Sequence, residues 1–281
     1  TDPARRELDM GFQFDHVDLG LEAGKFHPRP LRPGELADCL SVWQEAQGEV
    51  GWNSLYLDNH DQPRAVSRFG DEAYRYESAT ALATALHMLR GTPYVYQGEE
   101  LGLPEHTTME DEARQDPLWE RTNHLVPGRD GCRVPLPWTR EGASYGYNAS
   151  GRTWLPQPEG WGEYSPQAQE GCEDSTLTLY RQAIALRREL GLGRGSVEWL
   201  DGEPGVLHLC NGTTGIVLNT TEQPVAIEGA GRTLITSWRR SETDGVDAAN
   251  TVEAAGAVVV PPNGACWLDD SAGGTDGGDP R

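Results

Sequence analysis

Apolar and polar positions along residues 11–96 follow two periods, one typical of strands and one typical of helices. Three short apolar runs predict strands: residues 11–14, 53–57 and 92–96. Two longer stretches with apolar residues at helical spacing predict helices: residues 33–48 and 72–90. We expect Asp71 to cap the start of the second helix and Gly91 to end it. Strands that alternate with helices favour right-handed crossovers and a parallel sheet, which makes this part of the chain α/β.

The pattern changes twice after residue 102. Residues 103–172 have no persistent period but are rich in Pro, Gly, Trp and Arg, and a loop region of this length is usually functional. Residues 175–190 restore the helical period and end at a glycine-rich stretch. Beyond it, short strand-like runs alternate with Gly, Asn and Pro residues: 196–200, 206–210, 215–219, 225–227, 233–238 and 257–260. Such runs are typical of a small antiparallel sandwich, and we place a domain boundary near Gly193.

The charge of the chain narrows the classes of partner. Its 281 residues include 23 Lys and Arg against 44 Asp and Glu, which gives a formal net charge of −21. Phosphate backbones and anionic membranes would repel such a chain, so we expect neither nucleic acid nor a membrane as partner. No apolar run approaches the ~20 residues of a membrane span, and residues 1–10 lack the shape of a signal peptide, so we predict a cytoplasmic protein. The acidity and the single lysine, Lys25, fit either a GC-rich genome or a high-salt cytoplasm.

Signals for a cofactor or a metal are weak. The 5 cysteines are odd in number and have no CxxC spacing, so they predict neither a disulfide framework nor a zinc site. The 7 histidines are dispersed along the chain. The glycine-rich residues 191–195 follow a helix instead of joining a strand to one, so they predict a helix cap and linker rather than a phosphate loop. We therefore expect no cofactor and no metal.

The first candidate for chemistry is the sequence DNHDQPR at residues 58–64, which directly follows the second predicted strand. Loops at the carboxyl ends of strands build the active sites of parallel barrels, which makes His60 and Asp61 candidate catalytic residues. The alternative is a capped turn, because Asn, Asp and Pro are also common turn residues.

Four segments resemble the α-amylase family of glycoside hydrolases, in its α-glucosidase and oligo-1,6-glucosidase branch. NSLYLDNHDQPRAVSRFGD at 53–71 and GTPYVYQGEELG at 91–102 are similar to the seventh- and eighth-strand segments of that family. GFQFDHVDL at 11–19 resembles the sixth-strand segment, and RDGCRVPLPW at 129–138 resembles a loop that follows the barrel. The segments stand in the order of the family, and the resemblance covers about residues 10–270.

The resemblance implies an α/β fold, a partial (β/α)8 TIM barrel followed by a C-terminal antiparallel β-sandwich. Residues 1–193 would form barrel strands six to eight with a long substrate-contacting loop region, and residues 194–270 would form the sandwich domain. Residues 271–281, SAGGTDGGDPR, have the composition of a disordered tail. The chain does not start with Met and enters a strand-like run within about ten residues, so we expect it to be a fragment.

The resemblance also implies roles for three residues in retaining hydrolysis of α-glucosidic bonds. Asp61 would be the third carboxylate of the family, which binds sugar hydroxyls and favours the oxocarbenium-like transition state. His60 would donate to a neighbouring hydroxyl of the same sugar. Arg133 would contact the non-reducing end of that sugar, although Cys132 replaces the more usual small residue beside it.

The family nucleophile follows strand four and its acid/base follows strand five, and neither segment is among those matched here. The resemblance therefore implies a fragment of a retaining α-glucosidase for terminal α-linked glucose of malto- or isomalto-oligosaccharides, inactive by itself. We do not assign the missing roles to other carboxylates near the predicted strands: Asp15, Asp18, Glu99 and Glu100. The alternatives are a non-catalytic α-glucosidase-like carbohydrate-binding protein, and a transglycosylase or sucrose isomerase relative. In each case the partner is a small oligosaccharide, and the oligomeric state stays open.

Overall fold

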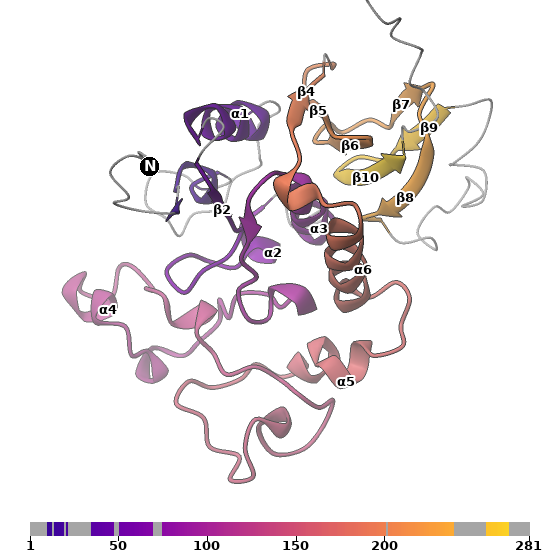
Figure 1. Ribbon diagram of the computed structural model, residues 1–281. Coiled ribbons are helices and arrows are strands. Elements are labelled where there is room, and N and C mark those ends of the chain that lie inside the picture. Colours follow the sequence, from indigo (N-terminus) through magenta and orange to yellow (C-terminus); the bar gives the residue numbers. More distant parts are fainter. Residues whose placement is uncertain are drawn as a thin grey trace, which may run out of the picture.

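The computed structural model describes most of the chain (Figure 1). The described residues are 10–12, 14–19, 21, 35–47, 51–69, 75–200, 202–238 and 257–269. The predicted helix cap Asp71 and the predicted tail at 271–281 lie outside these residues. Within them, no helix combines the length and the apolar character that crossing a bilayer requires.

Three short strands form a parallel sheet in the order β1 (Gly11–Phe12), β2 (Asn53–Leu55) and β3 (Thr92–Pro93). Both pairings are parallel, so the predicted parallel arrangement is confirmed. The strands are shorter than predicted because the chain leaves the sheet soon after each pairing, although the Tyr94 amide still donates to the Leu55 carbonyl at 2.7 Å. Their carboxyl ends therefore meet at one edge, where the loops that follow can converge.

Helices α1 (Glu35–Gln47) and α3 (Arg75–Met88) lie between these strands in the sequence, and the one-turn helix α2 (Ala65–Arg68) follows β2. The predicted role of Gly91 as the end of a helix is wrong, because α3 stops three residues earlier, at Met88. Gly91 has a φ of +135°, and a Cβ atom there would lie 2.7 Å from the carbonyl oxygen of Asn53. The glycine instead allows the close approach of two backbones.

The long region without a period forms a series of short turns of helix: η2 (Glu99–Leu101), η3 (Asp111–Ala113), α4 (Pro117–Arg121), η4 (Asp130–Cys132), η5 (Ala143–Gly146), η6 (Trp161–Tyr164) and α5 (Pro166–Gln169). It packs around a small core of its own, formed by Leu103, Met109, Val134, Leu136, Leu155 and Trp161. Helix α6 (Thr176–Glu189) follows, as predicted, and begins where the Ser175 hydroxyl accepts the Thr178 amide at 3.2 Å. A 3-10 turn, η7 (Leu192–Arg194), ends this part.

Two antiparallel sheets follow η7. One has the order β4 (Val197–Trp199), β5 (Val206–Asn211), β6 (Thr214–Asn219), β10 (Gly264–Asp269) and β8 (Arg232–Thr236). The other pairs β7 (Val225–Glu228) with β9 (Ala257–Val260). Antiparallel pairing among the predicted runs is confirmed for β4 with β5, β5 with β6 and β7 with β9. An apolar cluster joins the two sheets and includes Val217, Val258, Val260, Cys266 and Leu268.

The sequence analysis missed strand β10, which lies between β6 and β8 in the larger sheet. Residues 264–269, GACWLD, contain small residues and one Trp but no β-branched residue, so their strand propensity is weak. Every position from Gly264 to Leu268 is buried. Alternation is absent where both faces of a strand are covered. The Pro-Pro-Asn turn at 261–263 was the available signal for a strand beyond it.

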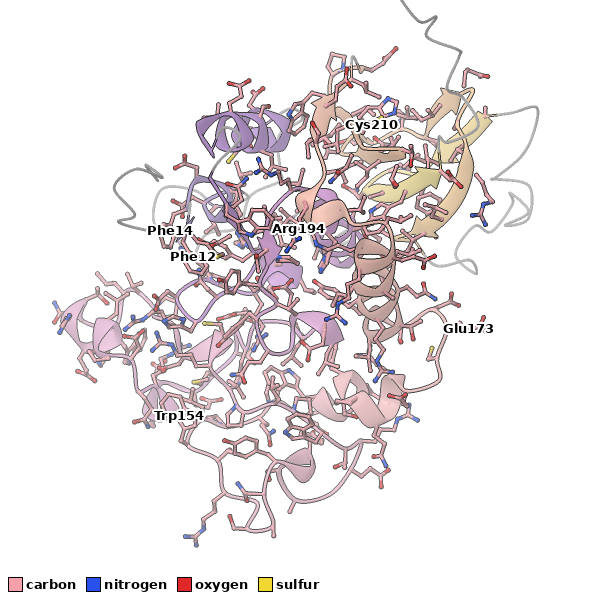
Figure 2. The ribbon with its side chains drawn as sticks, in the orientation of Figure 1. Phe12, Phe14, Trp154, Glu173, Arg194 and Cys210 are labelled. Carbon is pink, nitrogen blue, oxygen red and sulfur yellow. The ribbon has the colours of Figure 1, made fainter. Side chains whose placement is uncertain are left out.

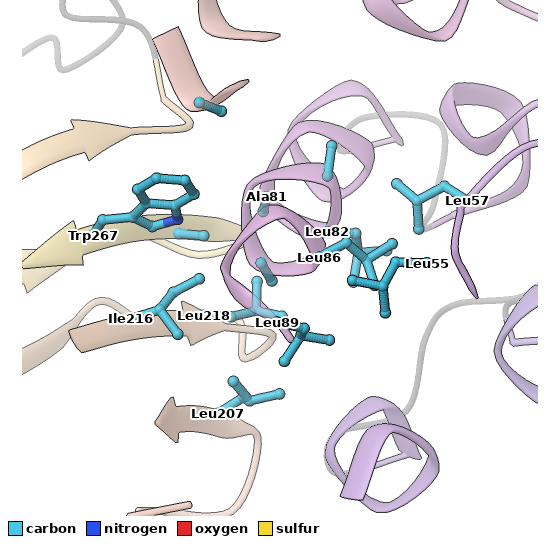
Figure 3. Packing of buried hydrophobic residues seen from close by; sticks show 14 of the residues in the cluster. Leu55, Leu57, Ala81, Leu82, Leu86, Leu89, Leu207, Ile216, Leu218 and Trp267 are labelled. Carbon is cyan, nitrogen blue, oxygen red and sulfur yellow. The ribbon is translucent and has the colours of Figure 1, made fainter. Parts of the chain in front are cut away.

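Helix α3 is the centre of the packing and joins the parallel sheet to the antiparallel one (Figure 3). Every residue from Ala79 to His87 is buried, and the polar side chains of Thr84 and His87 in this stretch bond to carbonyls of the preceding turn. Leu55 and Leu57 lie on one side of α3, and Trp267 of β10 lies on the other. The indole Nε1 of Trp267 donates to the carbonyl of Thr84 at 3.0 Å.

The opposite face of the parallel sheet carries aromatic side chains. Tyr56 alternates with Leu55 and Leu57, so it faces away from α3. The ring of Phe12 lies 5.3 Å from the ring of Tyr56 and 5.1 Å from that of Tyr94. Phe12 and Tyr94 are nonetheless 54% and 42% exposed, and Phe12 is labelled at the outer side of the parallel sheet in Figure 2. This face therefore presents apolar surface that the described residues leave uncovered.

Replacement of Trp267 should destabilise the protein strongly. The side chain is fully buried between α3 and the larger sheet, so Trp267→Ala leaves a cavity and removes the hydrogen bond to Thr84. We expect a loss of about 3–5 kcal/mol in the free energy of unfolding, measured by urea denaturation. Trp154→Ala is the matched control, because Trp154 lies in the loop region and is 55% exposed (Figure 2). Equal losses for the two variants would contradict the packing described above.

Salt should stabilise the folded chain. Its net charge of −21 produces self-repulsion that is strongest at low ionic strength. The Debye length falls from about 10 Å at ~0.1 M salt to about 3 Å at ~1 M, so added salt screens most of this repulsion. We expect the Tm to rise as KCl increases over this range. A Tm that stays constant or falls would show that self-repulsion does not limit stability.

Candidate functional site

The loop at residues 58–64 leaves the carboxyl end of strand β2 and enters helix α2. Asp58, its first residue, is buried, and its Oδ1 accepts the Ala65 amide at 2.6 Å. The guanidinium of Arg68, which is also buried, lies 3.7 Å from the same oxygen. Asp58 therefore fixes the end of the loop and the start of α2. These contacts of Asp58 also limit the positions that the tip of the loop can take.

Asp61 lies at the tip of this loop, and two arginines contact its carboxylate. Its Oδ1 accepts a hydrogen bond from Nη2 of Arg133 at 2.8 Å and another from Nη1 of Arg129 at 3.1 Å. The side chain of Asp61 is 47% exposed, so solvent or a ligand can reach it. Its amide donates to Oδ1 of Asn59 at 2.8 Å, an Asx turn that orients the loop. The result is a carboxylate with one oxygen engaged by arginines and an accessible face.

These contacts keep Asp61 ionised. Partial burial opposes the charge, but the hydrogen bond from Arg129 and the charges of His60, Arg129 and Arg133 lower the pKa of Asp61 below its ordinary value. An anionic group of fixed orientation can accept hydroxyl hydrogens and stabilise positive charge that develops nearby.

His60 lies beside this carboxylate and is more exposed than it, with 68% of its side chain accessible. Its Nε2 is 3.5 Å from Oδ2 of Asp61, and its carbonyl accepts a hydrogen bond from Nε of Arg133 at 2.8 Å. The three residues that the sequence predicted for the site, Asp61, His60 and Arg133, are thus brought together. Their roles toward a sugar stay a prediction.

The sequence analysis missed Arg129 and Asp116. Arg129 uses one edge of its guanidinium for Asp116, with Nε at 2.6 Å from Oδ2 and Nη2 at 3.1 Å from Oδ1, while Nη1 contacts Asp61. The repeat of arginine four residues apart in RDGCR, at 129 and 133, was the signal for a second basic residue. No sequence signal pointed to Asp116, because the loop that positions it has no period.

The turn η4 places Arg129 and Arg133 on the same side. A Cβ atom on Gly131 would lie 2.2 Å from Oε1 of Glu105 and 2.9 Å from the carbonyl oxygen of His106, so the close approach of this backbone requires glycine. The carbonyl of Cys132 accepts hydrogen bonds from Nη2 of Arg64 and from the hydroxyl of Tyr96, both at 3.1 Å. Burial raises the pKa of the Cys132 thiol to about 12, so it is an inert packing group. The turn is therefore attached to the loop at 58–64 and to the segment after β3.

Glu99 lies in the interior, next to this site. Its Oε1 accepts the hydroxyl of Tyr180 at 2.7 Å, and its Oε2 accepts the amides of Asp58 and Tyr96, each at 3.3 Å. These partners come from α6 and from the segments that follow β2 and β3. Burial and the neighbouring Asp58 carboxylate raise the pKa of Glu99 to about 8. These contacts join α6 to the two segments and give Glu99 a structural role.

Three other carboxylates lie near the parallel strands. Oε2 of Glu100 accepts the Gly98 amide at 2.8 Å, and Asp15 and Asp18 are exposed in the turn after β1. His16, in the same turn, is buried, and its Nε2 lies 2.5 Å from the carbonyl oxygen of Tyr56. Among the described residues, no group of three or more His, Cys, Asp or Glu could bind a metal ion.

Glu99→Gln should change how stability depends on pH. The pKa of Glu99 is about 8 in the folded chain, above its ordinary value near 4.5. The folded state therefore binds the proton more tightly, and the stability that this adds is present below about pH 4.5 and is lost as the pH rises towards 8. We expect the Tm of the unaltered chain to fall between pH 6 and about 8.5 by more than that of the variant.

The comparison must allow for Glu105, since burial raises its pKa to about 7 and its effect has the same sign. The difference between Glu99→Gln and Glu105→Gln, measured as Tm against pH, separates the two groups. Parallel Tm curves for the unaltered chain and Glu99→Gln would show that Glu99 does not retain its proton in the folded state.

Comparison with known proteins gives concordant matches. A family model described as the alpha amylase catalytic domain matches residues 1–193. The oligo-1,6-glucosidase of Parageobacillus thermoglucosidasius is 41% identical over 208 residues, which are 67% of this chain and 37% of that enzyme. The glucan 1,6-alpha-glucosidase of Streptococcus dysgalactiae subsp. equisimilis is 36% identical over 208 residues, which are 66% of this chain and 38% of the relative. The chain thus spans less than two fifths of these curated relatives.

Solved structures with a similar fold cover more of the chain. The trehalose-6-phosphate hydrolase of Bacillus licheniformis matches with a TM-score of 0.75 and 28% identity, over 95% of this chain and 52% of that protein. The trehalulose synthase of Pseudomonas mesoacidophila MX-45 matches with a TM-score of 0.78 and 26% identity, over the same shares. The chain spans about half of each.

Proposed function

The chain belongs to the α-amylase family of glycoside hydrolases, family 13, in its α-glucosidase branch, and from this premise we propose that it binds a terminal α-linked glucose unit at Asp61. The substrate would be a malto- or isomalto-oligosaccharide, and the reaction would be retaining hydrolysis. The names of the curated relatives, oligo-1,6-glucosidases and glucan 1,6-alpha-glucosidases, support this class of substrate.

The observation that carries the proposal is the state of Asp61. Its carboxylate is half exposed and is fixed through Oδ1 by two arginines at 2.8 and 3.1 Å, whose contacts favour the ionised form. Such a group can accept two hydroxyls of one sugar, and its charge favours the flattened, positively charged ring of the transition state over the relaxed chair. Binding that strengthens toward the transition state accelerates the reaction rather than only tightening the complex.

His60 and Arg133 would complete the contact with the same sugar. His60 is exposed beside Oδ2 of Asp61, where an imidazole N–H could donate to a neighbouring hydroxyl. Arg133 is 23% exposed and contacts both Asp61 and the His60 carbonyl, so it would orient the pair while it approaches the non-reducing end of the glucose. The three residues would form one wall of the sugar-binding site.

The bond-breaking carboxylates are not assigned to this chain. A retaining glycosidase needs a nucleophile and an acid/base about 5–5.5 Å apart, on opposite sides of the scissile bond. Of the carboxylates near the parallel strands, Glu99 is engaged by three interior donors. Asp15 and Asp18 lie in the segment that resembles strand six, whereas the family nucleophile and acid/base follow strands four and five. We therefore propose that further barrel segments supply the missing groups and that this chain alone is inactive.

We propose that residues 1–193 form strands six to eight of a (β/α)8 barrel and that residues 194–270 form a β-sandwich domain. The family match over 1–193 and the two antiparallel sheets beyond it support this division. The exposed aromatic face around Phe12 and Tyr94 supports the first part, because in a closed barrel other strands would cover it.

An alternative reaction deserves a direct assay, because the trehalulose synthase structure has a TM-score of 0.78 to this chain. In that alternative a sugar replaces water as the acceptor. A non-catalytic carbohydrate-binding protein is the other alternative, and an ionised carboxylate supported by two arginines argues against it.

The test uses a fusion enzyme in which this chain follows the part of the Parageobacillus thermoglucosidasius oligo-1,6-glucosidase that precedes its matched region. We expect the fusion enzyme to release glucose from isomaltose or maltose, measured with a coupled glucose assay. Sucrose is offered in parallel, with chromatography of the products. Formation of trehalulose without net hydrolysis would favour the transferase reading, and a folded fusion that binds sugar without turnover would favour the binding protein.

A further inference from the structure

Asp116 is a buried carboxylate in the loop region that has no role in the hydrolysis outlined above. None of its side chain is exposed, and it accepts four hydrogen bonds. Two come from the Arg129 guanidinium, one from the Arg129 amide at 2.8 Å, and one from the Leu118 amide at 3.0 Å. The carboxylate therefore cannot rotate without breaking several bonds, and it presents a fixed edge to Arg129.

Arg129 extends this fixed geometry to Asp61. A guanidinium is planar, so the position of Nε and Nη2 on Asp116 determines where Nη1 points. Nη1 donates to Oδ1 of Asp61 at 3.1 Å. Asp61 is half exposed on a loop, and its Oδ1 is the oxygen that both arginines contact. Its Oδ2 has His60 at 3.5 Å and is the oxygen turned away from the arginines.

We propose that Asp116 is a positioning residue that orients Arg129, so that Arg129 fixes the Asp61 carboxylate with its second oxygen available to the sugar. The proposal rests on the sugar-binding role proposed for Asp61. Arg129 would then bridge the buried carboxylate of Asp116 and the accessible carboxylate of Asp61. Asp116 would act on the substrate only through Arg129.

The local fold supports a dedicated place for Asp116. Oδ2 of Asp130 accepts the amides of Gln115 and Asp116 at 2.6 and 2.8 Å, which fixes the backbone that carries it. Gly128 has a φ of +75°, and a Cβ atom there would lie 2.8 Å from that of Asp116. The hydrogen bonds from Arg129 lower the pKa of Asp116 far below its ordinary value, so the carboxylate stays charged. The charge of Asp116, the fixed backbone around it and the space left by Gly128 thus all favour its contact with Arg129.

The first test is a double-mutant cycle in the fusion enzyme, with Asp116→Asn, Arg129→Ala and the double variant. If Asp116 acts through Arg129, each single variant should lower kcat/KM by about tenfold or more, and the double variant should be no worse than Arg129→Ala alone. Glu163→Gln is the matched control, because Glu163 forms an exposed ion pair with Arg140 at 2.6 Å outside this site. Losses that multiply in the double variant would overturn the proposal.

Chemical rescue adds a readout that a purely structural role would not change. Millimolar guanidinium should restore part of the activity of Arg129→Ala, because Asp116 and Asp61 still form a site for that ion. It should not restore the double variant, which lacks the carboxylate that positions the ion. Equal rescue of both variants would show that Asp116 does not position the guanidinium group.

The second test needs no turnover and uses the fusion enzyme, because we expect the chain alone to associate. An NMR titration follows the carboxyl carbon of Asp61, whose pKa should rise in Asp116→Asn because Arg129 is no longer directed at it. The value should not change in Glu163→Gln. An unchanged pKa in Asp116→Asn would overturn the inference. An inactive fusion enzyme together with a raised pKa would instead contradict the proposed function and leave the positioning role supported.

Discussion

Asp61→Asn should reduce kcat/KM of the fusion enzyme by at least about 10³-fold. The amide retains the shape of the side chain and one acceptor, but it loses the charge that would face a developing oxocarbenium ion. It also loses the ion pairs with Arg129 and Arg133, at 3.1 and 2.8 Å. Steady-state kinetics on an aryl α-glucoside measures the effect, and the Tm of the variant shows that the fold is retained.

Two further variants are compared with Asp61→Asn. His60→Ala should cost less, about 10²-fold, because His60 would contribute one hydrogen bond from an exposed position. Glu99→Gln should change the stability with little change in kcat, because every described contact of Glu99 lies in the interior. If Glu99→Gln were the most damaging of the three, a carboxylate after the third parallel strand would perform the role assigned here to Asp61.

The chain alone should hydrolyse no α-glucoside, whereas the fusion enzyme should turn over. Hydrolysis with retention needs two carboxyl groups on opposite sides of the bond, and we assign neither to this chain. This difference in turnover between the fusion enzyme and the chain alone should be the largest effect among these predictions. An aryl α-glucoside assay at high protein concentration measures it, with the purified fusion enzyme as the positive control.

The state of the chain alone is a useful companion measurement. Among the described residues, the parallel sheet has the order β1-β2-β3 and its outer strands pair with no further strand, and the face around Phe12 and Tyr94 is apolar and exposed. Such surfaces promote association, so we expect light scattering to show oligomers or aggregates of the chain that the fusion enzyme does not form. A monomeric chain that cleaves an aryl α-glucoside would contradict the assignment of the catalytic carboxylates to other segments.

The strands and helices with a clear period could be predicted from the sequence, and those without one could not. The helices now described as α1 and α6 follow their apolar periods closely, and the parallel pairing follows from the alternation of strands and helices. Strand β10 was missed because both of its faces are buried, which removes the alternation that marks a half-buried strand. Gly91 was misread because its reason lies in a contact with Asn53, nearly forty residues earlier.

In the site, residues adjacent in the sequence could be predicted, whereas contacts between distant segments could not. Asp61 and His60 stand next to each other in the sequence after a strand, so their proximity needed no tertiary information. The contact of Arg133 with Asp61 spans 72 positions, and only the resemblance to a family brought that arginine forward. Asp116 is connected to the site through Arg129, along a loop whose position depends on glycines and backbone hydrogen bonds. No pattern of apolar residues encodes such a connection.

The central claim is that the Asp61 carboxylate binds the terminal glucose. A crystal structure of the fusion enzyme with glucose tests this most directly. We expect two ring hydroxyls within about 3.0 Å of the Asp61 carboxylate, at least one of them on Oδ2, while Arg129 and Arg133 stay on Oδ1. Glucose bound in the site with no hydroxyl in contact with Asp61 would contradict it.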